Sequence, residues 1–140
     1  MATTSSISVF NPETNLWHSV YCHFDGYLSH NGKILFEHYT TLASALKLVS
    51  EGDMSILAPS CDKPDGHTFD DPEKGYCIYY GRDRGEKRTN QWIGEEIDLA
   101  VSPKFGQNYN YWFKDGNWYC LEYQNGQTPL SKECFDIVED

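Results

Sequence analysis

Two short charged motifs hold the side chains of this sequence that are best suited to chemistry. The first motif reads Tyr21-Cys22-His23-Phe24-Asp25-Gly26-Tyr27. Alternation along a strand puts Tyr21, His23 and Asp25 on one face, where the imidazole and the carboxylate can pair. We interpret this pair as a contact to a ligand, with Tyr27 beside it, or as a structural hydrogen bond that ends the strand.

The second motif combines two arginines with two carboxylates. It reads Gly81-Arg82-Asp83-Arg84-Gly85-Glu86. The guanidinium groups of Arg82 and Arg84 can hold a carboxylate or a phosphate through paired hydrogen bonds, but Asp83 and Glu86 can instead neutralise them in a structural network. We expect the two motifs to meet, because each follows a strand of one predicted sheet. The predicted ligand- or partner-binding residues are His23, Asp25, Tyr27, Arg82, Asp83, Arg84 and Glu86.

The sequence has no motif of a familiar catalytic or metal-binding class. The segment 61–71 contains Cys, His and carboxylate side chains, which are metal-ligand types, but their spacing fits neither a zinc site nor a calcium loop. The patterns GxSxG, GxGxxG and HExxH and the P-loop are also missing. We therefore assign no catalytic residue, no metal ligand and no cofactor, and we do not expect an enzyme.

A β-sheet has to position these motifs, and the sequence predicts most of its strands. Runs rich in aromatic and β-branched residues are typical of strands, and apolar residues at helical spacing predict helices. The predicted strands span residues 5–11, 16–24, 76–80, 109–113 and 117–123, and the predicted helices span 34–39, 42–49 and 129–138. Asp115-Gly116 between two aromatic strands is a strong hairpin signal. The pattern predicts an α+β fold, with an antiparallel sheet of four to six strands and helices packed on one face.

Length and composition fit a single domain, residues 1–140, with a core of its own. Hydrophobic residues make up 39% of the chain and aromatic residues 15%, which suits both a core and a binding surface. The net charge of −10 argues against binding to nucleic-acid backbone or to a membrane, and it favours a partner with a basic surface.

The cysteines indicate a reducing compartment. They are Cys22, Cys61, Cys77, Cys120 and Cys134, an odd number without a CxxC pair. Cys22, Cys77 and Cys120 lie in apolar, strand-like runs, so we predict that they are buried free thiols. Residues 1–6 have neither the basic nor the apolar part of a signal peptide. Together these features predict a cytoplasmic protein.

Segments spread over most of the chain form one pattern when they are taken in order. They are residues 20–27, 31–35, 38–39, 52–57, 80–86 and 112–119. The pattern resembles a family of small uncharacterised phage proteins, which carry a Tyr-Cys-His-Trp-Asp-Gly-Tyr signature followed by Asn-Gly and a helix. Phe24 and Leu28 depart from the Trp and Pro that are common in that family. The resemblance implies a phage origin and a place in the host bacterial cytoplasm, but it supplies no reaction.

Three functions remain open, and small phage accessory proteins in general act by binding. The first is host takeover or anti-defence, by stoichiometric binding and inhibition of a bacterial host or immune protein whose basic groove an acidic face can fill. The second is a nucleotide-binding module, a sponge for a signalling nucleotide, that uses Arg82 and Arg84 together with stacking aromatic residues. The third is a small hydrolase that uses His23 and Asp25, with the arginines as an anion clamp.

Overall fold

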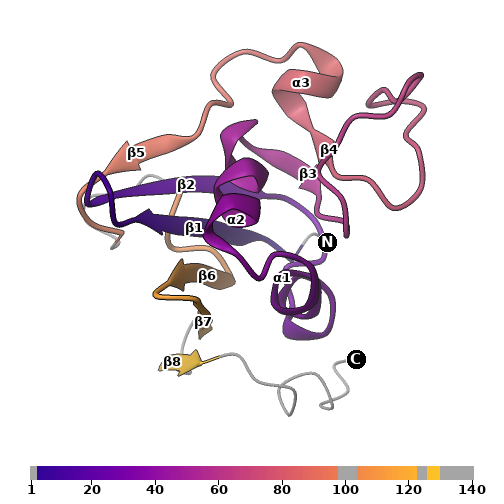
Figure 1. Cartoon of the computed structure of the whole chain (residues 1–140). Coiled ribbons are helices and arrows are strands. Elements are labelled where there is room, and N and C mark those ends of the chain that lie inside the picture. Colours follow the sequence, from indigo (N-terminus) through magenta and orange to yellow (C-terminus); the bar gives the residue numbers. More distant parts are fainter. Residues whose placement is uncertain (1–2, 98–103, 123–125, 130–140) are drawn as a thin grey trace.

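The computed structural model describes residues 3–97, 104–122 and 126–129, the last of these as backbone only (Figure 1). The strands are β1 (Ser5–Asn11), β2 (Leu16–Cys22), β3 (Met54–Ile56), β4 (Ile78–Tyr79), β5 (Trp92–Gly94), β6 (Tyr109–Lys114), β7 (Asn117–Glu122) and β8 (Gly126–Pro129). The helical segments are η1 (Leu28–Gly32), α1 (Lys33–His38), α2 (Leu42–Ser50) and α3 (Tyr80–Arg84). These elements confirm the predicted α+β class. No helix in the described residues is long and apolar enough to span a membrane.

The strands form one mixed sheet in the order β4-β3-β2-β1-β6-β7-β8, with β5 paired to β2 beside this path. β1 runs parallel to β6, and β2 runs parallel to β3, while the other pairs are antiparallel. The prediction of an antiparallel sheet of four to six strands is therefore wrong in its pairing and its size. The chain between β2 and β3 passes through three helical segments, and a long crossover of this kind is what lets two strands run parallel.

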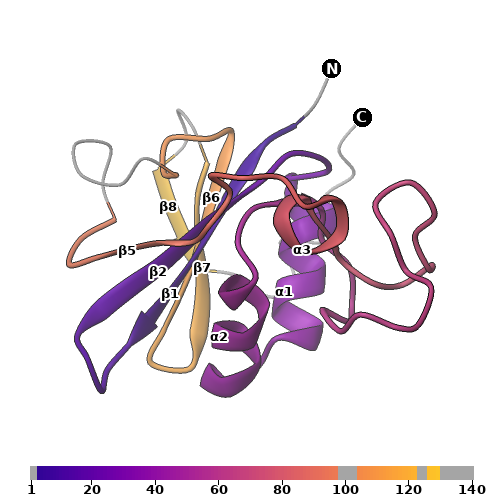
Figure 2. The ribbon, with the colours of Figure 1, turned by 90° about the horizontal axis from the view of Figure 1, so that it is seen from above.

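The helices α1 and α2 cover one face of this sheet (Figures 1 and 2). Ile7, Val20 and Tyr111 lie in register on β1, β2 and β6, so their side chains point to the same face. All three are fully buried in one core with Leu35 of α1 and Leu48 of α2. The packing of these helices on one face follows from the apolar spacing of their sequences.

The start of α2 and the tip of the β6–β7 hairpin agree with the predictions. Thr41 precedes α2, and its side chain accepts a hydrogen bond from the Ser44 backbone N–H, while the Ser44 side chain accepts one from Thr41 N–H. Asp115 and Gly116 both take positive φ, at 53° and 82°, which is the two-residue turn that matches the twist of the two strands.

Two predicted elements differ in the structure. β4 contains only two residues, and the charged segment that follows it forms the short helix α3. Thr128 and Pro129, which the sequence places at the start of a last helix, belong to β8, which pairs with β7. The remainder of that predicted helix, with Cys134, lies outside the described residues.

Cys22, Cys77 and Cys120 are buried free thiols, as predicted, and Cys61 is buried too. Burial raises the pKa of the Cys22 thiol to about 12, and burial likewise raises the pKa of Cys77 to about 11. A thiol in such a setting is a poor nucleophile at neutral pH. These cysteines therefore act as small apolar side chains of the core.

Candidate functional site

The first charged motif forms the turn that follows β2, and its side chains pair differently from the prediction. His23 Nδ1 lies 2.6 Å from the hydroxyl oxygen of Tyr21. The Tyr27 hydroxyl donates to Asp25 Oδ1 at 3.2 Å. The expected pairing of His23 with Asp25 is therefore wrong. β2 ends at Cys22, and Asp25 takes a φ of 58°, so the alternation of a strand does not extend to this carboxylate.

Other residues of this motif and of the following Asn-Gly pair hold the turn against β1. The backbone N–H of Gly26 donates to Thr3 O at 2.8 Å, and a Cβ at Gly26 would lie 2.7 Å from Thr4 O, so only glycine fits there. Asn31 is fully buried, and its side-chain amide donates to Ser5 Oγ at 3.1 Å. Much of the motif that resembles the phage family is thus explained by packing.

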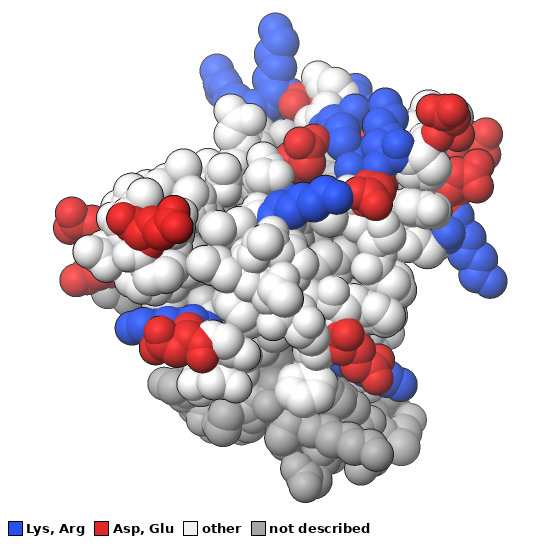
Figure 3. All heavy atoms as spheres, in the orientation of Figure 1, with Lys and Arg blue, Asp and Glu red and all other residues white. Residues whose placement is uncertain are grey.

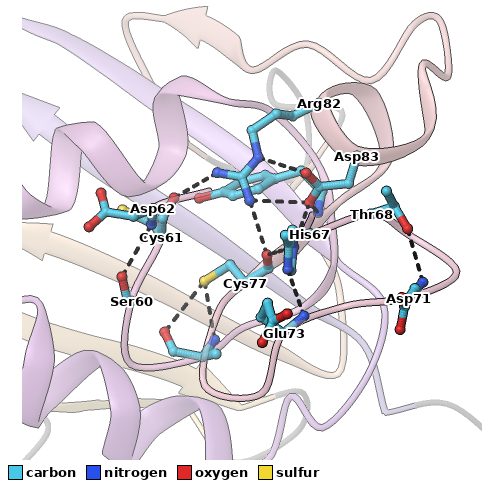
Figure 4. A network of polar contacts seen from close by, with 12 residues as sticks. Ser60, Cys61, Asp62, His67, Thr68, Asp71, Glu73, Cys77, Arg82 and Asp83 are labelled. Carbon is cyan, nitrogen blue, oxygen red and sulfur yellow. Dashed lines mark hydrogen bonds and ion pairs between the residues drawn. The ribbon is translucent and has the colours of Figure 1, made fainter. Parts of the chain in front are cut away.

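All three guanidinium nitrogens of Arg82, in the second motif, form hydrogen bonds inside the protein (Figure 4). Its Nε donates to Asp83 Oδ1 at 2.8 Å, and one terminal nitrogen donates to Cys61 O at 2.7 Å. The other terminal nitrogen donates to Cys77 O and to Asp83 Oδ2, both at 3.2 Å. The guanidinium also lies 4.5 Å from the centre of the Tyr79 ring. Arg82 therefore ties α3 to the segments before and after the loop 62–76.

Asp83 is the buried centre of this network. Its side chain is completely inaccessible to solvent, and its Oδ2 accepts a hydrogen bond from the Tyr79 backbone N–H at 2.8 Å. Burial pushes the pKa of Asp83 upward, but the hydrogen bonds from Arg82 and from Tyr79 N–H outweigh burial and hold this pKa below its usual range. Asp83 is thus an ionised structural carboxylate, and it is not exposed to a ligand.

His67 completes the network, and its tautomer follows from its partners. The Glu73 backbone N–H donates to His67 Nδ1 at 2.9 Å, so Nδ1 has no hydrogen and Nε2 carries it. His67 Nε2 lies 3.1 Å from Cys77 O and 3.3 Å from Asp83 Oδ2. Sequence reasoning did not assign this role to His67, because no local pattern connects residue 67 with residue 83.

Arg84 and Glu86 lie on the surface and form an ion pair of 2.6 Å with each other. The Arg84 guanidinium also covers the Phe69 ring, 4.1 Å from its centre. In the described part of the chain, no hydrogen bond or ion pair joins Arg84 or Glu86 to His23 or Asp25. The turn after β2 and the start of α3 both bond to the β3 region, through His23 N to Met54 O and Tyr80 N to Asp53 O. The two motifs are therefore neighbours across β3, but they do not form one constellation.

A different feature is better shaped for binding: an aromatic hollow on the face of the sheet opposite α1 and α2. Its volume is about 560 Å³, within the range of sites that take small ligands or single side chains. The lining residues are Trp17, Ile97, Phe105, Trp112, Lys114, Asp115, Tyr119 and Leu121. We call this feature the aromatic hollow.

Register explains why these aromatic rings gather. Trp112 and Tyr119 are directly opposite each other on β6 and β7, and their rings stack with centres 5.7 Å apart. Trp17 of β2 packs against Phe10 of β1, with ring centres 5.1 Å apart. All four belong to the alternate positions of their strands, opposite the core positions.

Phe105 reaches the aromatic hollow from a segment that crosses the same face. Lys104 Nζ pairs with Asp53 Oδ2 at 2.8 Å, and the Gly106 backbone N–H donates to Asn110 Oδ1 at 2.9 Å. These two contacts fix the backbone on both sides of Phe105. The high aromatic content of the sequence was a signal for such a surface, but only the strand pairing shows which rings share it.

The aromatic hollow lies at an acidic end of the sheet. β1 and β6 are parallel, and β5 is antiparallel to β2, so β1, β5 and β6 all end on this side. The exposed carboxylates just after these ends are Glu13, Glu95, Glu96 and Asp115. In Figure 3 the charged side chains at the end of the molecule that carries the β1–β2 turn and β5 are mostly Asp and Glu. Lys114 is the basic residue of this end, and its Nζ lies 5.1 Å from the centre of the Phe10 ring.

Neither a metal site nor a known relative helps to assign the function. Within the ranges that the structure describes, no group of three or more His, Cys, Asp or Glu residues could hold a metal ion. The resemblance to the phage family rests on the sequence pattern alone and stays a prediction. Comparison of the chain with protein-family models, with curated proteins and with solved structures gave no significant match.

Proposed function

We propose that this chain is a small phage-type accessory protein that acts in the bacterial cytoplasm by stoichiometric binding and inhibition of a host or immune protein with a basic surface. The observation that carries the proposal is the aromatic hollow of about 560 Å³ at the acidic end of the sheet. Aromatic anchors surrounded by complementary charge are typical of protein–protein interfaces. The net charge of −10 supports a basic partner, because opposite charge speeds association and selects the partner.

The charged motifs give little support to catalysis. A general base needs a free nitrogen or oxygen within reach of a substrate proton. The Nδ1 of His23 is hydrogen-bonded to Tyr21, so its Nε2 would have to act as the base, and Asp83 is buried among its own donors. Asp25 contacts Tyr27 and does not orient the imidazole. The hydrolase that would use His23 and Asp25 therefore has little support in the geometry.

The proposal is tested with the tagged full chain in bacterial lysate. We expect one host protein to be retained in a fixed molar ratio, in a complex whose mass can be measured by light scattering. Because surface charges are screened by salt, we expect its affinity to fall as the ionic strength rises. Failure to retain any protein in a fixed ratio, or an affinity that salt does not change, would contradict the proposal.

Two charge-reversed variants locate the binding surface. In the first, Glu13, Glu95 and Glu96 at the acidic end are changed to Lys, and in the second, Asp65, Asp70 and Asp71 of the long loop are changed to Lys. All six carboxylates are exposed, and both variants gain the same charge. We expect only the first variant to lose the partner. Equal losses would mean that overall charge, and not this end of the sheet, determines binding.

One observation keeps the nucleotide-binding module as a second candidate. The Arg84 guanidinium covers the Phe69 ring, and about half of its side chain is exposed (47%), so a phosphate could reach it. Arg82 does not contribute, since its nitrogens are bonded within the chain. Mass spectrometry of the solution released by denaturing the purified chain would detect a bound nucleotide, and Arg84→Ala should then abolish its recovery.

A further inference from the structure

We infer that the aromatic hollow is a receptor for one arginine side chain of the partner, with the Asp115 carboxylate as its counter-ion. This inference rests on the proposed function and names the group that the partner supplies. A planar guanidinium stacks on aromatic faces and forms hydrogen bonds with a carboxylate at the same time. The aromatic hollow offers both kinds of contact.

The rings provide the first contact. Trp17, Phe105, Trp112 and Tyr119 all line the aromatic hollow, and the faces of such rings attract cations, most strongly in the case of tryptophan. The Trp112 and Tyr119 rings stack on each other, with planes 19° apart and centres 5.7 Å apart, so a guest in the aromatic hollow meets a pair of rings held together across β6 and β7.

The carboxylate provides the second contact. Asp115 is exposed at the tip of the β6–β7 turn and lines the aromatic hollow. Among the described residues, its side chain makes no hydrogen bond or ion pair. It therefore keeps all of its acceptor capacity for a guest.

Lys114 shows that a cation can lie over an aromatic ring on this face of the sheet. Its ammonium lies over the Phe10 ring at 5.1 Å, and Phe10 is not a lining residue of the aromatic hollow. The ammonium is thus held by a neighbouring ring on the same face of the sheet. A second cation, supplied by a partner, would meet the remaining rings and the Asp115 carboxylate.

The carboxylates around the aromatic hollow disfavour an anionic ligand. Glu95 and Glu96 directly precede Ile97, which lines the aromatic hollow, and Asp115 is part of the lining. A phosphate placed among these carboxylates would be repelled, and among the described lining residues only Lys114 would compensate. An arginine side chain lowers the like-charge repulsion of this end, whereas a nucleotide raises it.

The test uses the full chain labelled with ¹⁵N and two blocked tripeptides. Acetyl-Gly-Arg-Gly-amide carries the guanidinium, and acetyl-Gly-citrulline-Gly-amide has the same shape without the charge. We expect the arginine peptide to shift the resonances of the Trp112 indole N–H and of the Asp115 and Gly116 amides. The citrulline peptide should bind about tenfold more weakly, since the cation–π and ionic contacts are lost. Equal binding of the two peptides, or no binding of the arginine peptide, would overturn the inference.

Matched variants distinguish binding in the aromatic hollow from non-specific binding elsewhere on the protein. Trp112→Leu and Asp115→Asn should each weaken the arginine peptide several-fold, by roughly three- to tenfold. Phe24→Leu and Glu37→Gln change an exposed ring and an exposed carboxylate elsewhere, and they should leave the affinity unchanged. Asn tolerates the positive φ of residue 115, so Asp115→Asn keeps the test valid if Trp112→Leu does not fold. Equal losses in the control variants, or tighter binding of adenosine monophosphate than of the arginine peptide, would refute the assignment.

The inference and the proposed function can fail separately. If the host protein is still retained by Trp112→Leu and Asp115→Asn, the proposed function stands and the arginine receptor is wrong. If the arginine peptide binds as expected but no host protein is retained, the receptor stands and the proposed function is wrong.

Discussion

The α3 region and the aromatic hollow use charged and aromatic side chains in opposite ways. Around α3, Arg82 and Asp83 bond to each other and to backbone groups, and Arg84 pairs with Glu86. At the aromatic hollow, the Asp115 carboxylate makes no hydrogen bond or ion pair among the described residues, and aromatic rings form much of the lining. The difference teaches that a dense charged motif is not by itself a site. Charges that are withdrawn from water must find partners within the chain, so Arg82 and Asp83, two of the predicted binding residues, are held by bonds within the protein.

The largest effect on stability is expected from Asp83→Ala. This change removes the buried carboxylate that accepts hydrogen bonds from Arg82 and from Tyr79 N–H. We expect the free energy of unfolding to fall by about 3–5 kcal/mol, because the guanidinium loses its partner. Urea denaturation followed by tryptophan fluorescence measures this difference. A midpoint within error of the wild type would show that the network does not stabilise the domain.

Thiol labelling of the Asp83→Ala variant shows whether the loss of stability is confined to the α3 region. Arg82 holds the carbonyl groups of Cys61 and Cys77, whereas Cys120 lies on β7. We expect Asp83→Ala to speed the alkylation of Cys61 and Cys77 and to leave Cys120 slow, as read by mass spectrometry. Equal acceleration at all three thiols would mean that the two regions unfold together.

A comparison of two nearby arginines gives the next largest effect. Arg82→Ala should lower the free energy of unfolding by about 2–3 kcal/mol, since several charged hydrogen bonds are lost. Arg84→Ala should leave the unfolding midpoint close to that of the wild type, because an exposed ion pair contributes little. Thermal and urea denaturation of both variants measure the difference. If Arg84→Ala were as damaging as Arg82→Ala, the distinction between the part-buried Arg82 and the exposed, ion-paired Arg84 would be wrong.

A smaller effect is expected at the turn beside the aromatic hollow. Gly116 takes a φ of 82°, so Gly116→Val should cost about 1–2 kcal/mol through backbone strain. Gly116→Asn is the matched control, because asparagine adopts positive φ more easily, and it should cost less. Denaturation midpoints measure both changes. Equal costs for Val and Asn would show that strain at this turn is not the cause.

The smallest effect on the free energy of unfolding is expected when the pH is lowered from neutral. The pKa of Asp83 is lowered in the folded chain, so its contribution is complete above the unfolded value of about 3.9 and is lost as the pH falls through the folded value. The stability difference between wild type and Asp83→Asn should therefore stay constant at neutral pH and shrink below about pH 4. Urea midpoints of both proteins across this range give the answer. A difference that grows in acid would contradict the ionised state of Asp83.

The sequence by itself determined the features that depend on neighbouring residues. The Asp115-Gly116 turn follows from two residues that accept positive φ, and the start of α2 follows from the side chain of Thr41. The burial of Cys22, Cys77 and Cys120 follows from their apolar surroundings. These features need only local propensity and the pattern of apolar residues, and so does the α+β class.

Only the tertiary structure decided how distant segments pair. The parallel pairing of β1 with β6 brings residues 5–9 beside residues 109–113, and this pairing places Trp112 on the same face as Trp17. The partners of Arg82 are likewise remote, because they include the carbonyl oxygen of Cys61. The entropic cost of closing a loop rises only slowly with its length, so the sequence does not single out one long-range pairing among many. For this reason the internal bonds of Arg82 and the aromatic hollow could not be predicted, although each residue that forms them was visible in the sequence.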